Sequence, residues 1–211
     1  MNNKFSLAKG EASHIEGKDC LALASNTHAE GYRAIAFGDY SHAEGYNTYA
    51  YGASSHAEGA NTSANDAYAH AEGSSTFANG ESSHSEGIST IAIGEASHAE
   101  GYGVSSPAGT SVTWSWTAGG TTLTASNTYQ NLEVGDIIRY NGNSNVYAKI
   151  LSKPSSTTIT IDKALSESAG SGVTLYKITG IAYKDYSHAE GEGTVASGSN
   201  SHSSGQYTIA D

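Results

Sequence analysis

The chain has 211 residues, with 10 basic and 21 acidic side chains that give a net charge of −11, and only 37% of its residues are hydrophobic. This acidic balance argues against non-specific binding to nucleic acid or to anionic membranes, because both depend on clusters of Lys and Arg. A single Cys excludes a disulfide framework, and no apolar run reaches the about 18 residues of a membrane span, so we expect no membrane insertion by this segment.

A repeat of 14 residues organises most of the chain. All nine histidines recur at this spacing, from His14 to His98 and again at His188 and His202. Counted from each His, Gly lies at +3 in all nine units, Glu at +2 in eight and Ala at +8 in eight. Each unit contains two segments of strand length separated by turns rich in Gly, Asn, Asp and Ser. The period therefore predicts a parallel β-solenoid with one coil per unit.

The alternation of side chains along each strand predicts which residues face the interior of a coil. Small residues occupy −1 and +1 of the first strand, as Ser41 and Ala43, and +6 and +8 of the second, as Thr48 and Ala50. We expect these positions to fill a thin interior. Cys20 lies at +6 and is predicted to be a small buried residue without redox function.

Apolar side chains at +7 and +9 of the repeat predict that several chains assemble. They point away from an interior that is already filled, so a single chain would expose an apolar stripe along its whole length, more than soluble monomers tolerate. We predict a homotrimer, because three solenoids around one axis are the simplest closed arrangement; a two-fold assembly stays open as an alternative. The predicted interface residues are Leu21, Ile35, Tyr49, Phe77, Ile91, Ile93, Ile181, Val195 and Ile209.

The repeat is interrupted once, between His98 and His188. The predicted organisation is β-roll repeats over 1–103, an inserted β-module over 104–179 and resumed repeats over 180–211. Alternating β-branched runs in the insert, with hairpin signals at Gly119-Gly120 and Asn141-Gly142, predict a small antiparallel barrel or sandwich of about six strands. Its predicted core comprises Val112, Trp114, Leu123, Val134, Ile137, Ile150, Ile159, Ile161, Val173 and Leu175.

The sequence motif of the repeat is clearest as TIAIGEASHAEG at Thr90 to Gly101. This motif resembles the head repeat of the YadA-like trimeric autotransporter adhesins. This resemblance implies an all-β, left-handed parallel β-roll in a tight trimer. The recurring SHAEG is similar to repeat regions in tail-fibre proteins of bacteriophages and prophages. Residues 201–211 are similar to the junction that precedes a self-cleaving chaperone in such phage proteins.

The recurring His and Glu residues are the side chains of the repeats that could catalyse a reaction, titrate or bind a metal. Adjacent Ser and His point to opposite faces of a strand, so Ser-His-Ala-Glu does not form a hydrolase triad, and we predict no catalytic residue. We expect a solvated outer face on which Glu favours imidazolium, so that the rod gains positive charge as the pH falls. A metal column is the alternative, but two ligands from one strand do not complete a coordination shell, and we predict no metal and no cofactor.

Aromatic residues of the insert are the candidate contacts with a host receptor, either a cell-surface glycan or a protein. They are Trp114, Trp116, Tyr140 and Tyr147. Aromatic rings can stack on sugars. A glycan-degrading tailspike would instead need paired carboxylates, and the spacing of Glu133, Asp136, Asp162 and Glu167 singles out no pair.

Together these features predict a structural and adhesive segment of a trimeric fibre, not an enzyme. The predicted identity is a phage tail fibre or appendage that contacts the host surface, located in the virion tail. The alternative is the head of a bacterial trimeric surface adhesin, located on the cell surface. Both predictions are extracellular.

Overall fold

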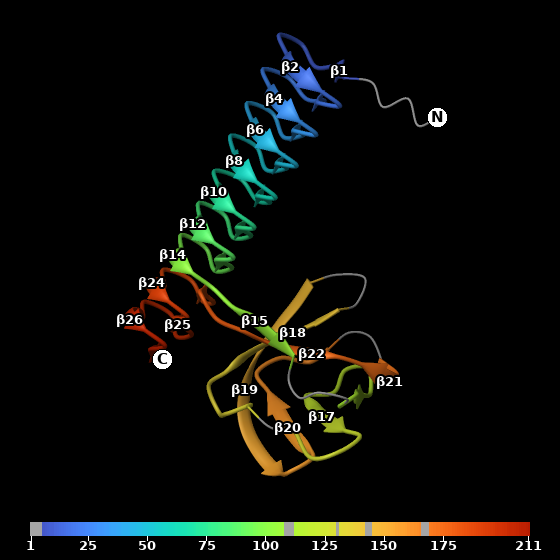
Figure 1. The fold of residues 1–211 in the computed structure, drawn as a ribbon, viewed down its shortest axis with the longest axis vertical. Coiled ribbons are helices and arrows are strands. Elements are labelled where there is room, and N and C mark those ends of the chain that lie inside the picture. Colours follow the sequence, from blue (N-terminus) through green and yellow to red (C-terminus); the bar gives the residue numbers. More distant parts are fainter. Residues whose placement is uncertain (1–5, 108–111, 130, 142–144, 166–168) are drawn as a thin grey trace. The chain divides into compact units, whose positions relative to one another are not determined.

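The structure is a computed structural model that describes residues 6–107, 112–129, 131–141, 145–165 and 169–211. These residues form β-strands and turns (Figure 1). Their contacts divide the chain into two compact units, residues 1–103 with 180–211 and residues 104–179. Within the described residues, no helix has the length and hydropathy to cross a bilayer.

The first unit is a parallel β-solenoid built from two sheets, which confirms the predicted fold class. Figure 1 shows its coils stacked one after another. The sheet of long strands has nine members: β2 (His14–Lys18), β4 (His28–Tyr32), β6 (His42–Tyr46), β8 (His56–Ala60), β10 (His70–Ser74), β12 (His84–Ile88), β14 (His98–Tyr102), β24 (His188–Glu192) and β26 (His202–Gln206). The sheet of short strands has ten: β1 (Leu7–Ala8), β3 (Leu21–Ala22), β5 (Ile35–Ala36), β7 (Tyr49–Ala50), β9 (Ser63–Ala64), β11 (Phe77–Ala78), β13 (Ile91–Ala92), β23 (Ile181–Ala182), β25 (Val195–Ala196) and β27 (Ile209–Ala210).

The register places each residue beside its counterpart in the next coil. His70 pairs with His84 and Glu72 with Glu86. The register continues across the insertion, where Glu100 of β14 pairs with Glu190 of β24. The inserted residues therefore leave the ladder of identical side chains unbroken.

Small residues fill the interior of the solenoid, as predicted. From the coil of His14 to the coil of His188, the Ala residues at +1 and +8 and the Thr residues at +6 are buried, and Cys20 is buried among them. In the last coil Thr208 is exposed and Ala210 is half-buried. The Ser at −1 also closes a turn, since the Ser55 Oγ donates a hydrogen bond of 2.7 Å to the Gly52 carbonyl oxygen and Ser97 does the same to Gly94. Hydroxyl and methyl groups thus replace the thick aliphatic core that the composition does not provide.

The apolar stripe at +7 and +9 points outward from the sheet of short strands. Leu7, Phe37 and Tyr51 are 48%, 55% and 44% exposed. The remaining predicted interface residues divide into three sets by burial: Leu21, Ile35, Tyr49, Phe77 and Ile93 are half-buried, Ile209 is exposed, and Ile91, Ile181 and Val195 are buried.

Exposure of the stripe along its whole length was therefore a wrong expectation. The buried positions lie in β13, β23 and β25, next to the point of insertion. Ile181 pairs with Ile91 on one side and with Val195 on the other, so each of these β-branched side chains lies beside another. The exposed stripe is best developed in the coils before β13.

The insert is an antiparallel sheet of eight described strands, more than the six expected. They are β15 (Ser105–Pro107), β16 (Trp114–Trp116), β17 (Thr122–Ala125), β18 (Ile137–Asn141), β19 (Asn145–Ser155), β20 (Thr158–Ile161), β21 (Ala169–Val173) and β22 (Leu175–Ile178). Their order is β15-β22-β18-β19-β20-β17-β16-β21, with the long β19 joining the two halves. Gly142 of the second predicted hairpin lies outside the described residues.

Most of the predicted core of the insert is buried. Trp114, Leu123, Ile150 and Ile159 share one apolar interior with most of the other predicted members. Ile137 is also buried but lies outside this cluster, and two further members are not fully buried. Val173 is only partly buried, because it ends its strand. Val134 is 57% exposed, because it lies in the turn before β18 and not in a strand.

Candidate functional site

Stacked histidines form a continuous column on the outer face of the long-strand sheet. From His28 to His202, the imidazole centroids of successive coils lie 4.6–4.8 Å apart, and their planes differ by 12° or less. His14 is different, because its ring meets His28 edge-on at 63°. The parallel register produces this stack, since it repeats the same side chain at about 4.8 Å.

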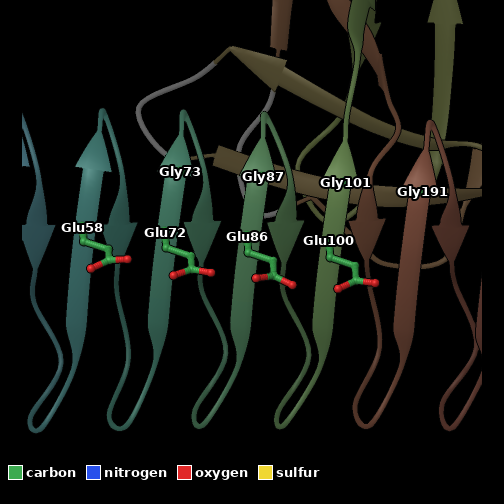
Figure 2. A pocket seen from close by; sticks show the side chains of 8 residues that line it. All are labelled: Glu58, Glu72, Gly73, Glu86, Gly87, Glu100, Gly101 and Gly191. Carbon is green, nitrogen blue, oxygen red and sulfur yellow. The ribbon is translucent and has the colours of Figure 1, made fainter.

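A second column of carboxylates runs beside the first. Figure 2 shows Glu58, Glu72, Glu86 and Glu100 side by side on successive strands, all leaning in the same direction. They line an open groove of about 670 Å³ together with Gly73, Gly87, Gly101 and Gly191. Glycine at +3 has no side chain, so space remains beside each carboxylate. We name the histidines from His28 to His202 and the glutamates at +2 the His–Glu ladder.

The two columns are close without being hydrogen-bonded to each other. The distance from Nε2 of His42 to Oε2 of Glu44 is 3.5 Å, and the corresponding distance from His70 to Glu72 is 3.9 Å. The Nε2 atoms of seven ladder histidines are buried and have no hydrogen-bond partner among the described residues: His28, His42, His56, His70, His84, His98 and His188.

Titration of the histidines runs opposite to the prediction. Burial, followed by repulsion from a neighbouring imidazole, lowers the pKa of His42, His56, His84 and His98 below 6.5. The adjacent carboxylates raise the same pKa values but by less. The carboxylates do favour imidazolium, but burial and, after it, repulsion between the stacked rings lower the pKa values more strongly.

We expect these four histidines to titrate with midpoints below 6.5 in a proton–nitrogen NMR titration. Because the folded pKa is lowered, the unfolded chain binds more protons, and this contribution to stability is lost as the pH falls from 6.5 through the folded pKa. Midpoints above 6.5 would contradict the stacking argument.

Four neighbouring glutamates of the ladder, from Glu58 to Glu100, shift one another's pKa values. Hydrogen bonds with Glu72 and Glu100 raise the pKa of Glu86 to about 7. Hydrogen bonding to Glu72 also raises the pKa of Glu58, whereas hydrogen bonds from Glu86 lower the pKa of Glu72 and of Glu100. Among these four glutamates, raised and lowered pKa values thus alternate along the column, since closely spaced carboxylates cannot all ionise at once.

Glu86→Gln is expected to stabilise the rod above pH 7 and to leave it nearly unchanged below pH 4.5. The raised pKa of Glu86 contributes stability that is present at low pH and lost as the pH rises through about 7, whereas the Gln amide donates at every pH. The gain should stay under about 1 kcal/mol, because the ladder is exposed to solvent. Urea unfolding at both pH values measures it, and an equal effect at the two would count against proton sharing.

The aromatic residues proposed as receptor contacts are buried. Trp114, Trp116, Tyr140 and Tyr147 are at most 7% exposed, so an exposed aromatic platform was a wrong expectation. Both Trp residues do lie on one face of β16, but that face is the core, where the Trp116 ring meets Tyr140 edge-on at 4.9 Å. Ser115 between them faces outward.

A shallow groove of about 380 Å³ lies on the outer side of β16 and β17. It is lined by Ser115, Trp116, Thr117, Thr122 and Thr124. Sequence reasoning missed it, although the alternate hydroxyl residues of TWSWT and TTLT were a visible signal. Hydroxyl donors beside one aromatic residue fit a polar ligand such as a sugar.

The carboxylates of the insert serve the fold. Asp136 is buried and pairs with Lys177, with 2.8 Å between its Oδ1 and the Nζ atom. Glu133 pairs with Lys153 at 3.1 Å, and Asp162 accepts a hydrogen bond from the backbone N–H of Lys149. Glu167 lies outside the described residues. These pairings leave the described carboxylates in structural roles.

The fold and the ladder define a structural repeat protein, a parallel β-solenoid with identical side chains stacked along its length. Two segments of the chain, residues 85–103 and 189–210, match the YadA head domain repeat. No curated protein matches the chain. The chain thus carries YadA-type head repeats, which are adhesin-type structural units and support an extracellular location at a surface.

Proposed function

We propose that the chain is a segment of a homotrimeric fibre that attaches to a host cell surface. The rod is the spacer of the fibre, and the insert is its receptor-binding module. The exposed apolar stripe carries this proposal. Phe37 and Tyr51 are about half exposed on adjacent coils and lie 6.0 Å apart between ring centroids, in a row that continues through the half-buried Ile35 and Tyr49.

A repeating stripe is best covered by an identical stripe. Copies of the rod have the same spacing of about 4.8 Å between coils. Equivalent side chains of two copies can therefore lie opposite each other over many coils. A closed arrangement covers every stripe, and three thin rods bring all of them to one axis. The match to YadA head repeats supports the same arrangement.

Cross-linking tests the trimer at the stripe. In a Cys20→Ser background, Phe37→Cys treated with a bismaleimide should give products of two and three chains and none larger. Glu44→Cys lies on the opposite sheet and is the matched control, for which we expect little product. Equal products from both variants, or products beyond three chains, would refute the arrangement.

The repeated SHAEG supports a phage tail fibre or appendage as the parent protein. The alternative is the head of a bacterial trimeric adhesin, which the family match also supports. The neighbouring coding sequence distinguishes them. A following chaperone domain fits the fibre, and a following coiled coil with an outer-membrane anchor fits the adhesin.

The hydroxyl-lined groove of the insert is the proposed receptor site, for a cell-surface glycan or a protein. Three copies in a trimer would present three grooves and gain avidity. Thr124→Arg should abolish binding to a glycan array and to host cells, because the new side chain fills the groove. Thr128→Arg is the control, since Thr128 is exposed outside the groove. Unchanged binding by Thr124→Arg would remove the groove from the proposal.

A further inference from the structure

We propose that the His–Glu ladder binds divalent transition-metal ions, each held by two histidines of successive coils and the glutamate of the first. Four such groups have ligand atoms that all lie within 4.8 Å of one another: His42 with Glu44 and His56, His70 with Glu72 and His84, His98 with Glu100 and His188, and His188 with Glu190 and His202. The inference goes beyond the adhesive function and needs only one chain. It replaces our sequence prediction of no metal, which considered ligands from single strands.

The geometry is close to that of a tetrahedral site. Bonds of about 2.0–2.2 Å to imidazole nitrogen and carboxylate oxygen place neighbouring ligand atoms about 3.4 Å apart. The Nε2–carboxylate distances of 3.5 Å at His42 and 3.8 Å at His98 are near this value. The rings of each pair are stacked with nearly parallel planes, so both must turn toward each other to share an ion. Their side chains are 32–36% exposed, which leaves room for this turn.

The unpartnered nitrogens are an independent sign of a missing ligand. Buried polar atoms are normally satisfied, yet the Nε2 atoms of His42, His70 and His98 have neither a donor nor an acceptor among the described residues. A metal ion would use the lone pair of a neutral imidazole at each of them. Imidazole with one carboxylate and an open position to solvent suits Zn²⁺, Ni²⁺ and Cu²⁺.

The carboxylate column adds a reason for a cation to bind. Glu58, Glu72, Glu86 and Glu100 lie side by side along one groove, so their negative charge is concentrated there (Figure 2). A divalent ion between the columns neutralises that charge without a proton. The ladder lies on the sheet opposite the apolar stripe, so an assembly through the stripe leaves it open to solvent.

The stoichiometry follows from the ligand count. Each Nε2 binds one ion, so the two groups that share His188 exclude each other. At most three of the four groups can therefore hold an ion at the same time, which gives three ions per chain. This limit separates specific binding from a loose association with acidic side chains, which would show no such stoichiometry.

Two triple variants with equal numbers of lost imidazoles test the proposal. His56→Gln with His84→Gln and His188→Gln removes a ligand from every group. His14→Gln with His28→Gln and His202→Gln keeps the three mutually compatible groups intact. The full chain is prepared without a polyhistidine tag, and ZnCl₂ is titrated by calorimetry, with Co²⁺ absorption reporting the ligand geometry.

We expect about three Zn²⁺ per chain for the unaltered protein and for the variant that lacks His14, His28 and His202. The variant that lacks His56, His84 and His188 should lose all three sites. Circular dichroism confirms that both variants keep the solenoid. Equal losses in the two variants, or binding that neither changes, would overturn the proposal. The mass of the assembly is measured on the same samples, so failure of the metal site and failure of the trimer are distinguishable.

Discussion

Gly73→Ala is expected to abolish stable folding of the rod, at a cost above about 4 kcal/mol, which only severe core defects reach. Gly73 has a φ of +104°, and a Cβ atom there would lie 2.2 Å from the carbonyl oxygen of Gly87 in the next coil. That oxygen belongs to the backbone and cannot move without breaking the register. The same contact recurs from Gly17 to Gly191, so +3 accepts no side chain in these coils.

Gly119→Ala in the insert is the matched control. Gly119 also has a positive φ, +76°, but a Cβ atom would meet nothing within 4 Å. Only the backbone strain remains, and it costs about 1–2 kcal/mol. Thermal unfolding followed by circular dichroism measures both variants. Similar unfolding temperatures for the two would show that close stacking of the coils does not determine stability.

Ile35→Asp combined with Tyr49→Asp is expected to separate the fibre into single chains that keep their solenoid. Both side chains lie on the stripe, and their strands pair directly, Ile35 with Tyr49. In an assembly the new carboxylates would be buried and unpaired beside their symmetry copies, at a cost of several kcal/mol per chain. In a single chain these positions are only half-buried, so the carboxylates can reach solvent and cost less.

Tyr40→Asp combined with Tyr68→Asp is the control for this experiment. These side chains are 66% and 64% exposed in turns and lie outside the stripe. Sedimentation velocity should report single chains for the stripe variant and an unchanged assembly for the control. Dissociation of both, or of neither, would contradict the stripe as the interface.

The solenoid could be predicted because the same residue types recur every 14 residues, and each of them meets one structural requirement of the coil. Gly at +3 and Ala at +8 have one backbone or packing requirement each, and it repeats in every coil. The strand alternation then assigned the faces correctly, including the burial of Cys20.

The insert was less predictable because it has no repeat. Val134 has a strand-forming side chain but lies in a turn. Trp114 and Trp116 share a face, as alternation requires, yet the sequence does not say whether that face is core or surface. The packing of the whole sheet decides it.

The electrostatics of the ladder were predicted in the wrong direction for a different reason. The sequence shows which groups are neighbours. The direction of a pKa shift depends on how strongly burial and neighbouring imidazoles lower the pKa and how strongly neighbouring carboxylates raise it. Burial lowers the pKa of His84 most, and repulsion from the stacked rings of His70 and His98 lowers it further. The Glu72 carboxylate at 4.0 Å raises the pKa by less. The exposure of the stripe likewise varied with position, since Ile181 is buried and Phe37 is not.

The molar mass of the unaltered chain in solution tests the central claim most directly. Size-exclusion chromatography with light scattering at micromolar concentration should report three times the chain mass of 21.7 kDa. A single species at the mass of one chain would contradict the account, because the apolar stripe would then be stable in water without a partner.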